Sequence, residues 1–188
     1  MENINFLSDF ETSKHASIKE RKPILLQFER EKCSGCKKLD KLTYTNREVI
    51  DELTKWFVPL KLQILEDHKI RSHFSAVWTP SFYLTDRNQK IYYRADGYFN
   101  PEDFRIQMRI AISQYLLSRG KYQDVINLMN NGLQLFPQNP SASKLLFIRG
   151  QAEYLLNWNN KVFRATMSEL LERYPESAEA RMWPWMED

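Results

Sequence analysis

The sequence has no apolar run that approaches the ~20 residues of a membrane helix, so we expect no membrane partner. It also has no long stripe of basic residues, and its net charge of +3 is too small to indicate a nucleic-acid binder. With only two cysteines, the chain cannot depend on a framework of disulfide bonds for its stability. A chain of 188 residues buries roughly 70% of its unfolded surface, so a core of its own can hold it together.

What is present is ordinary for a globular protein. Hydrophobic residues make up 43% of the chain and charged residues 27%, which excludes a disordered chain. The length fits one domain with an appendage, or two small domains. The first residues have no basic start and no long apolar stretch, unlike a secretory signal. We therefore expect a cytoplasmic protein, although a processed chain given a new Met would begin in the same way.

Residues 1–119 alternate between helical and strand patterns. Short apolar or alternating runs predict strands over residues 24–28, 56–64, 81–85 and 89–94. Helical periodicity and capping residues predict helices over residues 4–20, 36–42, 46–53, 66–75 and 101–118. This order of elements is typical of an α/β fold with a mixed sheet flanked by helices.

From about residue 101 onward the sequence predicts only helices, over residues 101–118, 121–135, 140–156 and 161–173. The segments 135–142 and 173–178 resemble each other 38 residues apart, near the tetratricopeptide period of about 34 residues. A plain helical hairpin with proline terminators gives the same pattern, and both interpretations stay open. We divide the chain into an α/β domain at residues 1–119 and a small all-α, tetratricopeptide-like extension at residues 120–188.

The two cysteines stand where a predicted strand meets a predicted helix, in the run Cys33-Ser34-Gly35-Cys36. A thiol reacts as its thiolate, which the free N–H groups and partial positive charge of a helix N-terminus stabilise. We therefore expect Cys33 to be exposed and reactive, and Cys36 to be more buried and within disulfide reach. Lysines on both sides of the motif, beginning with Lys32, add positive charge.

Two other interpretations of the cysteines stay open. They can be inert core residues, although a pair at this spacing on a strand-to-helix junction seldom is. His68 and His73 have a spacing allowed in a Cys₂His₂ zinc site. However, the 31 residues between Cys36 and His68 are about twice the spacing of a zinc finger. The two histidines are more simply explained as surface groups on a polar helix.

Residues 22–110 resemble the thioredoxin-like family in three segments, in the order and at the spacing of that family. These are the strand that leads to the cysteines, the loop with a cis-proline opposite them, and the terminal hairpin with its glycine, at residues 22–36, 78–81 and 86–98. A Cys-x-x-Cys pair followed about 44 residues later by Thr79-Pro80 and a hairpin is a specific signature. The resemblance covers about half of the chain.

The resemblance implies a role for each matching residue. Cys33 would attack a substrate disulfide or carry the mixed disulfide, and Cys36 would resolve it. Pro80, in a cis peptide bond, would pack against the disulfide and keep a metal ion from the dithiol, while the backbone of Thr79 would pair with a substrate peptide. No cofactor and no metal are implied beyond the redox-active disulfide.

Several positions depart from the pattern of the family. Gln27 stands where typical thioredoxins have a buried acid, and a glutamine cannot accept a proton. Glu29 is a candidate to replace that acid, unless it faces solvent. Lys32 replaces the tryptophan of the family, and Ser34-Gly35 replaces Gly-Pro. These neighbours support the active site and set its redox potential, but the direction of net electron flow is not readable from them.

We therefore predict a thiol–disulfide oxidoreductase that reduces or exchanges protein disulfides. An outside reductase or a small thiol would donate the electrons, because the chain has no second cysteine pair. Residues 120–188 are predicted to bind a protein partner or a second copy of the chain. The alternative is a chaperone or adaptor, similar to chaperedoxins, that binds clients through its helices and forms mixed disulfides without fast turnover. Two Trp and two Met at residues 182–186 either fold back on the helices or make such a contact.

Overall fold

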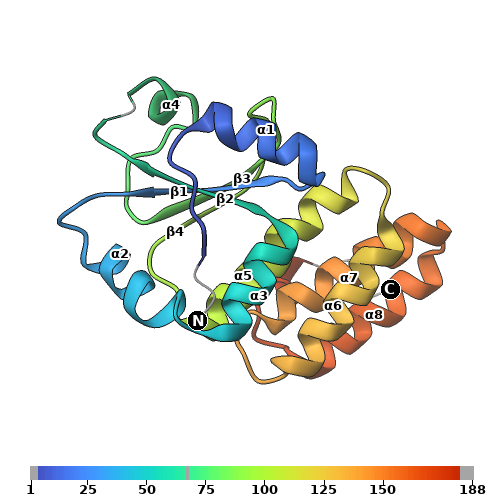
Figure 1. The fold of residues 1–188 in the computed structure, drawn as a ribbon. Helices are drawn as coiled ribbons and strands as arrows, with labels where there is room; N and C mark the ends of the chain where they lie inside the picture. The colour runs from blue at the N-terminus through green and yellow to red at the C-terminus, as the bar shows by residue number, and fades with distance from the viewer. Residues whose placement is uncertain (1–3, 67, 183–188) are drawn as a thin grey trace. The chain divides into compact units, whose positions relative to one another are not determined.

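The computed structural model describes residues 4–66 and 68–182 of the chain (Figure 1). Contacts divide the chain into two compact units, and the division lies between Ala111 and Ile112, inside helix α5 (Pro101–Leu117). The first unit is α/β and the second is helical. The predicted domain boundary between residues 119 and 120 lies just beyond the end of α5 and stays a prediction.

The first unit is built on a four-stranded sheet with the strand order β2-β1-β3-β4. The strands are β1 (Ile24–Glu29), β2 (Val58–Gln63), β3 (Ser81–Thr85) and β4 (Ile91–Asp96). Strand β1 pairs with β2 in parallel and with β3 antiparallel, and β3 pairs with β4 antiparallel. The predicted fold class, a mixed sheet flanked by helices and followed by further helices, is confirmed.

The central strand β1 is buried on both faces of the sheet. Its five leading residues, Ile24 to Phe28, are all buried, as a continuous apolar run in a central strand predicts. The ring of Phe28 has its centroid 5.8 Å from that of Tyr83 and 6.2 Å from that of Phe74, distances at which aromatic rings attract each other edge to face. This packing fixes the end of β1, from which the chain continues to Cys33.

The helices of the first unit are α1 (Phe10–Glu20), α2 (Ser34–Lys38), the π-helical turn Leu39–Thr43, α3 (Arg47–Trp56), α4 (His68–His73) and the first part of α5. Figure 1 shows α1 and α4 on one side of the sheet and α2, α3 and α5 on the other. Asn46 caps α3 as its sequence predicts, because its side-chain oxygen accepts a hydrogen bond of 3.0 Å from the backbone N–H of Val49.

Two of the predicted helices differ from the structure. The helix predicted over residues 4–20 begins only at Phe10, because the carboxylate of Asp9 accepts a 2.7 Å hydrogen bond from the backbone N–H of Thr12 and caps the helix there. Leu7 instead forms a parallel bridge with Leu60 of β2. The helix predicted over residues 36–42 begins two residues earlier and changes to the π-helical turn at its middle.

The second unit holds α6 (Tyr122–Leu135), α7 (Ala142–Asn157), α8 (Asn160–Arg173) and the 3-10 turn Ala180–Met182. The two similar sequence segments end their helices in the same way. The N–H of Phe136 bonds to the carbonyl of Gly132 and that of Tyr174 to the carbonyl of Leu170, both at 2.9 Å. The predicted tetratricopeptide likeness stays a prediction, and most of the Trp- and Met-rich end of the chain, from residue 183, lies outside the described residues. Throughout the described part, the helices lack the combined length and apolar character that crossing a bilayer requires.

A charged cluster joins α3 to α5. The guanidinium groups of Arg105 and Arg109 donate to the carboxylate of Glu52 at 2.7–2.8 Å, and Arg109 is only 1% exposed. Burial alone would raise the pKa of Glu52, but the hydrogen bonds from the two arginines hold that pKa below its ordinary value of 4.5. The carboxylate therefore stays ionised and compensates a buried cation.

We expect Glu52→Gln to lower the free energy of unfolding by about 3–5 kcal/mol at pH 7, because it leaves a buried guanidinium without its counter-charge. The folded pKa is lowered, so this stabilisation is complete above the unfolded pKa near 4.5 and is lost as the pH falls through the folded pKa. Urea unfolding at several pH values measures both effects. Asp51→Asn, which changes an exposed neighbour, should alter the unfolding free energy by less than about 0.5 kcal/mol; equal effects of the two substitutions would contradict the assignment.

Candidate active site

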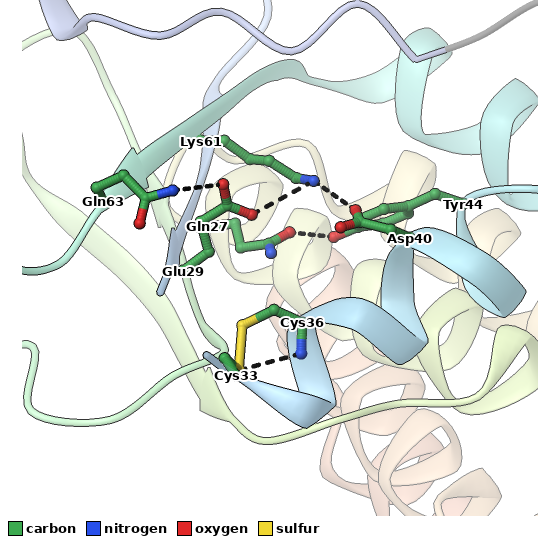
Figure 2. The surroundings of a disulfide bond; sticks show 8 residues. All are labelled: Gln27, Glu29, Cys33, Cys36, Asp40, Tyr44, Lys61 and Gln63. Carbon is green, nitrogen blue, oxygen red and sulfur yellow. Dashed lines mark hydrogen bonds and ion pairs between the residues drawn. A yellow bond between two sulfur atoms is a disulfide. The ribbon is translucent and has the colours of Figure 1, made fainter. Parts of the chain in front are cut away.

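Cys33 and Cys36 form a disulfide bond at the start of α2 (Figure 2). Cys33 is the N-cap residue of this helix, and its sulfur accepts a 3.1 Å hydrogen bond from the backbone N–H of Cys36. The same N–H group can stabilise a thiolate on Cys33 after the disulfide is reduced. The predicted strand-to-helix junction therefore gives the first sulfur a hydrogen-bond donor.

The prediction that Cys33 is exposed is wrong for this oxidised form. Cys33 is 6% exposed and Cys36 is 4% exposed, so the two side chains hardly differ in burial. The reason is that the sulfur of Cys33 is bonded to that of Cys36 and turned toward the first amides of the helix. The two sulfurs still differ in access, since Cys33 lines the neighbouring cleft and Cys36 does not.

The loop before β3 lies directly against the cysteine motif. The Thr79–Pro80 peptide bond is cis, and a methyl group placed on Gly35 would lie 2.9 Å from Cδ of Pro80. The carbonyl of Pro80 accepts a 2.8 Å hydrogen bond from the N–H of Gly97, which ties the loop to the end of β4. The structure thus brings the predicted motif and the predicted proline loop into contact.

A cleft of about 650 Å³ opens beside the disulfide. Six of the seven predicted site residues line it, namely Lys32, Cys33, Ser34, Gly35, Thr79 and Pro80. Cys36 is the seventh and lies beneath. Sequence reasoning missed Leu65, Arg71 and Val77, which also line the cleft. They come from the turn after β2, from α4 and from the loop after α4, and nothing in their local sequence marks them as site residues.

Gln27, the residue in place of a buried acid, lies in the surroundings of the disulfide (Figure 2). It is 1% exposed, and its side-chain oxygen accepts a short hydrogen bond from the hydroxyl of Tyr44. Burial raises the pKa of Tyr44 well above its ordinary value, and the carboxylates of Asp40 and Glu29 raise it further. Tyr44 is therefore neutral, so both side chains of this buried hydrogen bond, Tyr44 and Gln27, are uncharged.

The charged side chains near Gln27 and Tyr44 are Glu29, Lys61 and Asp40. The carboxylate of Glu29 lies 3.5 Å from the ammonium of Lys61, which lies 2.6 Å from the carboxylate of Asp40 (Figure 2). Glu29 also accepts a 2.9 Å hydrogen bond from the amide of Gln63. It is half-buried and paired, so the alternative that it simply faces solvent is not favoured; its role as a proton acceptor stays a prediction.

Nothing in residues 4–66 and 68–182 supports the zinc alternative, because no group of three or more His, Cys, Asp and Glu side chains there could hold a metal ion. His68 and His73 are exposed on the short helix α4. A ring nitrogen of His73 lies 3.2 Å from the backbone carbonyl of Gln89. Both histidines are therefore placed as the simpler interpretation expects, on the surface of a polar helix.

We expect Gly35→Ala to destabilise the protein and to slow its disulfide exchange, because the new methyl group meets the rigid ring of Pro80. The cost of overpacking is about 1–3 kcal/mol, and the better helix propensity of alanine offsets up to about 1 kcal/mol of it. Urea unfolding and the rate of disulfide reduction by dithiothreitol measure the two effects. The exposed neighbour offers a control for stability: Ser34→Ala should change the unfolding free energy by less than about 0.5 kcal/mol. A Gly35→Ala protein more stable than the original would disprove the contact.

Solved structures and a family model show which known proteins the chain is similar to. The solved structure of a thioredoxin from Thermus thermophilus is 13% identical, with a TM-score of 0.53 over 63% of this chain and 96% of that one. A structure from Bacteroides thetaiotaomicron, provisionally named a disulphide isomerase, is 21% identical, with a TM-score of 0.52 over 59% of this chain and 94% of that one. At these identities the likeness shows the fold, and no curated protein gives a significant match. The family of thioredoxin-like domains matches residues 10–111, more than half of the chain, and the chain belongs to that family.

Proposed function

We propose that the protein is a thiol–disulfide oxidoreductase that reduces or exchanges disulfide bonds of other proteins. The observation that carries this proposal is the Cys33–Cys36 disulfide at a helix start, with Gly35 of the same motif against Pro80 and Cys33 on an open cleft. An outside reductase or a small thiol supplies the electrons. We keep the cytoplasm as the proposed location.

The proposed reaction uses the two cysteines in turn. The thiolate of Cys33 attacks one sulfur of a substrate disulfide, a mixed disulfide forms, and the other substrate sulfur leaves as a thiolate. The thiolate of Cys36 then attacks the sulfur of Cys33 and releases the second substrate thiolate. Two electrons pass to the substrate, and the Cys33–Cys36 disulfide forms again. The N–H of Cys36, which bonds to the sulfur of Cys33, favours the first step because it stabilises the attacking anion.

We expect the reduced protein to be alkylated by iodoacetamide at Cys33 well before Cys36 at mildly acidic pH, because only Cys33 is both on the cleft and capped by an amide. Mass spectrometry of the labelled peptides measures the order. Insulin reduction should need both cysteines, and Cys36→Ser should trap substrates as stable mixed disulfides, whereas Cys33→Ser should not. Labelling of Cys36 first, or insulin reduction by the Cys33→Ser variant, would refute the assignment of roles.

A second candidate function is a chaperone or adaptor that binds clients or a second copy of the chain through the helical unit. The observation that favours it is a hollow of about 500 Å³ at α7 and α8, lined by Phe147, Gln151, Tyr154, Leu155, Asn160, Phe163 and Arg164. The ring of Tyr154 has its centroid 5.5 Å from that of the exposed Trp158 and 5.8 Å from that of Phe163. Open aromatic surfaces of this kind mark binding sites.

If the hollow binds clients, Leu155→Ser should weaken the suppression of aggregation of a heat-denatured client, because it removes apolar surface from the hollow. Leu156 is the matched control, since it is exposed and does not line the hollow. Light scattering of the client, with circular dichroism of each variant to verify folding, measures the effect. We expect a several-fold loss for Leu155→Ser and none for Leu156→Ser; identical behaviour of two folded variants would remove the case for this hollow.

A further inference from the structure

The cleft beside Cys33 carries positive charge. Its described lining contains three cationic side chains, Arg30, Lys32 and Arg71, and no acidic one. Arg30 and Lys32 precede the motif, and Arg71 comes from α4, which is far away in the sequence. None of the three forms an ion pair within the part of the chain that the structure describes. Their charge is therefore available to a molecule that enters the cleft.

Acidic side chains among the described residues near the cleft offset this charge unevenly. Glu31 and Glu66 line an adjoining hollow together with Arg30 and Lys32, so they weaken the field of those two cations. Arg71 lines the main cleft but not that hollow. Glu29 and Asp40 already face the ammonium of Lys61 (Figure 2). Among the three cations, Arg71 is therefore the one that does not share a hollow with Glu31 and Glu66.

Large apolar side chains stand on the same cleft. Val77 is 81% exposed, Trp78 63% and Leu65 59%, and all three are lining residues. Exposed apolar groups gathered at one place favour contact with an apolar part of a partner. A small anionic disulfide would use the cations and leave these side chains in water, whereas a protein segment can use both.

We infer that the preferred substrates are proteins whose disulfide is flanked by acidic residues with an apolar residue close by. This inference rests on the proposed function, and it adds the substrate class. Opposite charges at a binding site speed encounter and help to select partners, and the effect falls as salt screens it. A basic segment would meet like charge at Arg71, and its disulfide would reach Cys33 more slowly.

The test uses the pre-reduced full chain and three synthetic peptides with one internal disulfide each. The peptides share one sequence with a leucine near the cysteines and differ only in two flanking positions, which are Glu, Gln or Lys. Each second-order rate constant of reduction is divided by that of the same peptide with dithiothreitol, because neighbouring charges change the reactivity of a disulfide by themselves. We expect the Glu peptide to exceed the Lys peptide about tenfold at low salt, and about twofold or less in 0.5 M NaCl.

Two single-residue variants test whether the cleft causes the preference for the Glu peptide. Arg71→Gln should lower the normalised rate of the Glu peptide several-fold without lowering that of the Lys peptide. Arg87→Gln is the matched control, because Arg87 is exposed in the turn between β3 and β4 and does not line the cleft. Oxidised glutathione, which carries carboxylates but no leucine, should be reduced more slowly than the Glu peptide. A rate for glutathione equal to that of the Glu peptide would overturn the choice of a protein segment.

The results distinguish a failure of the substrate preference from a failure of the proposed function. If all three peptides are reduced at equal normalised rates, or if Arg71→Gln and Arg87→Gln behave alike, the substrate preference is wrong and the oxidoreductase function stands. If the reduced protein reacts with none of the peptides and not with insulin, the proposed function fails, and the substrate preference fails with it. A Lys peptide faster than the Glu peptide would also overturn the inference.

Discussion

The pairing of β1 with both of its neighbours is the constraint on which the rest of the first unit depends. Phe28 pairs with Ser81 of β3, and Glu29 pairs with Gln63 of β2. The first pairing sets Pro80 beside the place where the chain leaves β1 toward the cysteines, and the second sets the end of β2 on the other side. A shift of either register by one residue would move the side chains to the opposite face of the sheet and disrupt the packing on both faces. The apolar burial of β1 therefore holds the disulfide, the proline loop and the cleft in one place.

Near the disulfide, the side chains of Gln27 and Tyr44 are polar and buried, and a glutamine stands where typical thioredoxins have a buried acid. The oxygen of Gln27 accepts a hydrogen bond from the hydroxyl of Tyr44, and both groups are neutral, while Glu29, Lys61 and Asp40 form ion pairs nearer the surface. A neutral pair costs less to bury than an isolated carboxylate. The arrangement keeps charge out of the core, and it also means that the amide of Gln27 cannot exchange a proton with a thiol.

In the proposed reaction, the cleft would combine features that serve different steps. The hydrogen bond from the N–H of Cys36 acts on the sulfur that reacts. Under the proposed substrate preference, Arg71 and the exposed apolar residues of the cleft, of which Val77 is the most exposed, would contact the parts of a substrate that do not react. Binding energy from such remote groups selects among substrates whose disulfides are chemically alike. In the helical unit, the aromatic hollow at α7 and α8 offers a second surface of a different, less charged character.

The sequence by itself determined the order of the elements and the position of the cysteine pair at a strand-to-helix junction, while the proline loop as its counterpart came from the resemblance to the thioredoxin-like family. These features are encoded locally, because apolar periodicity, capping residues such as Asn46 and the spacing of two cysteines are properties of neighbouring residues. Only the tertiary structure decided that Arg71 and Leu65 share a cleft with Cys33, that Glu52 compensates the buried Arg109, and that Cys33 is buried in the disulfide form. Each of these depends on which distant segments the sheet and its helices bring together. Contacts between distant segments follow from strand register and packing, and local patterns carry no record of them.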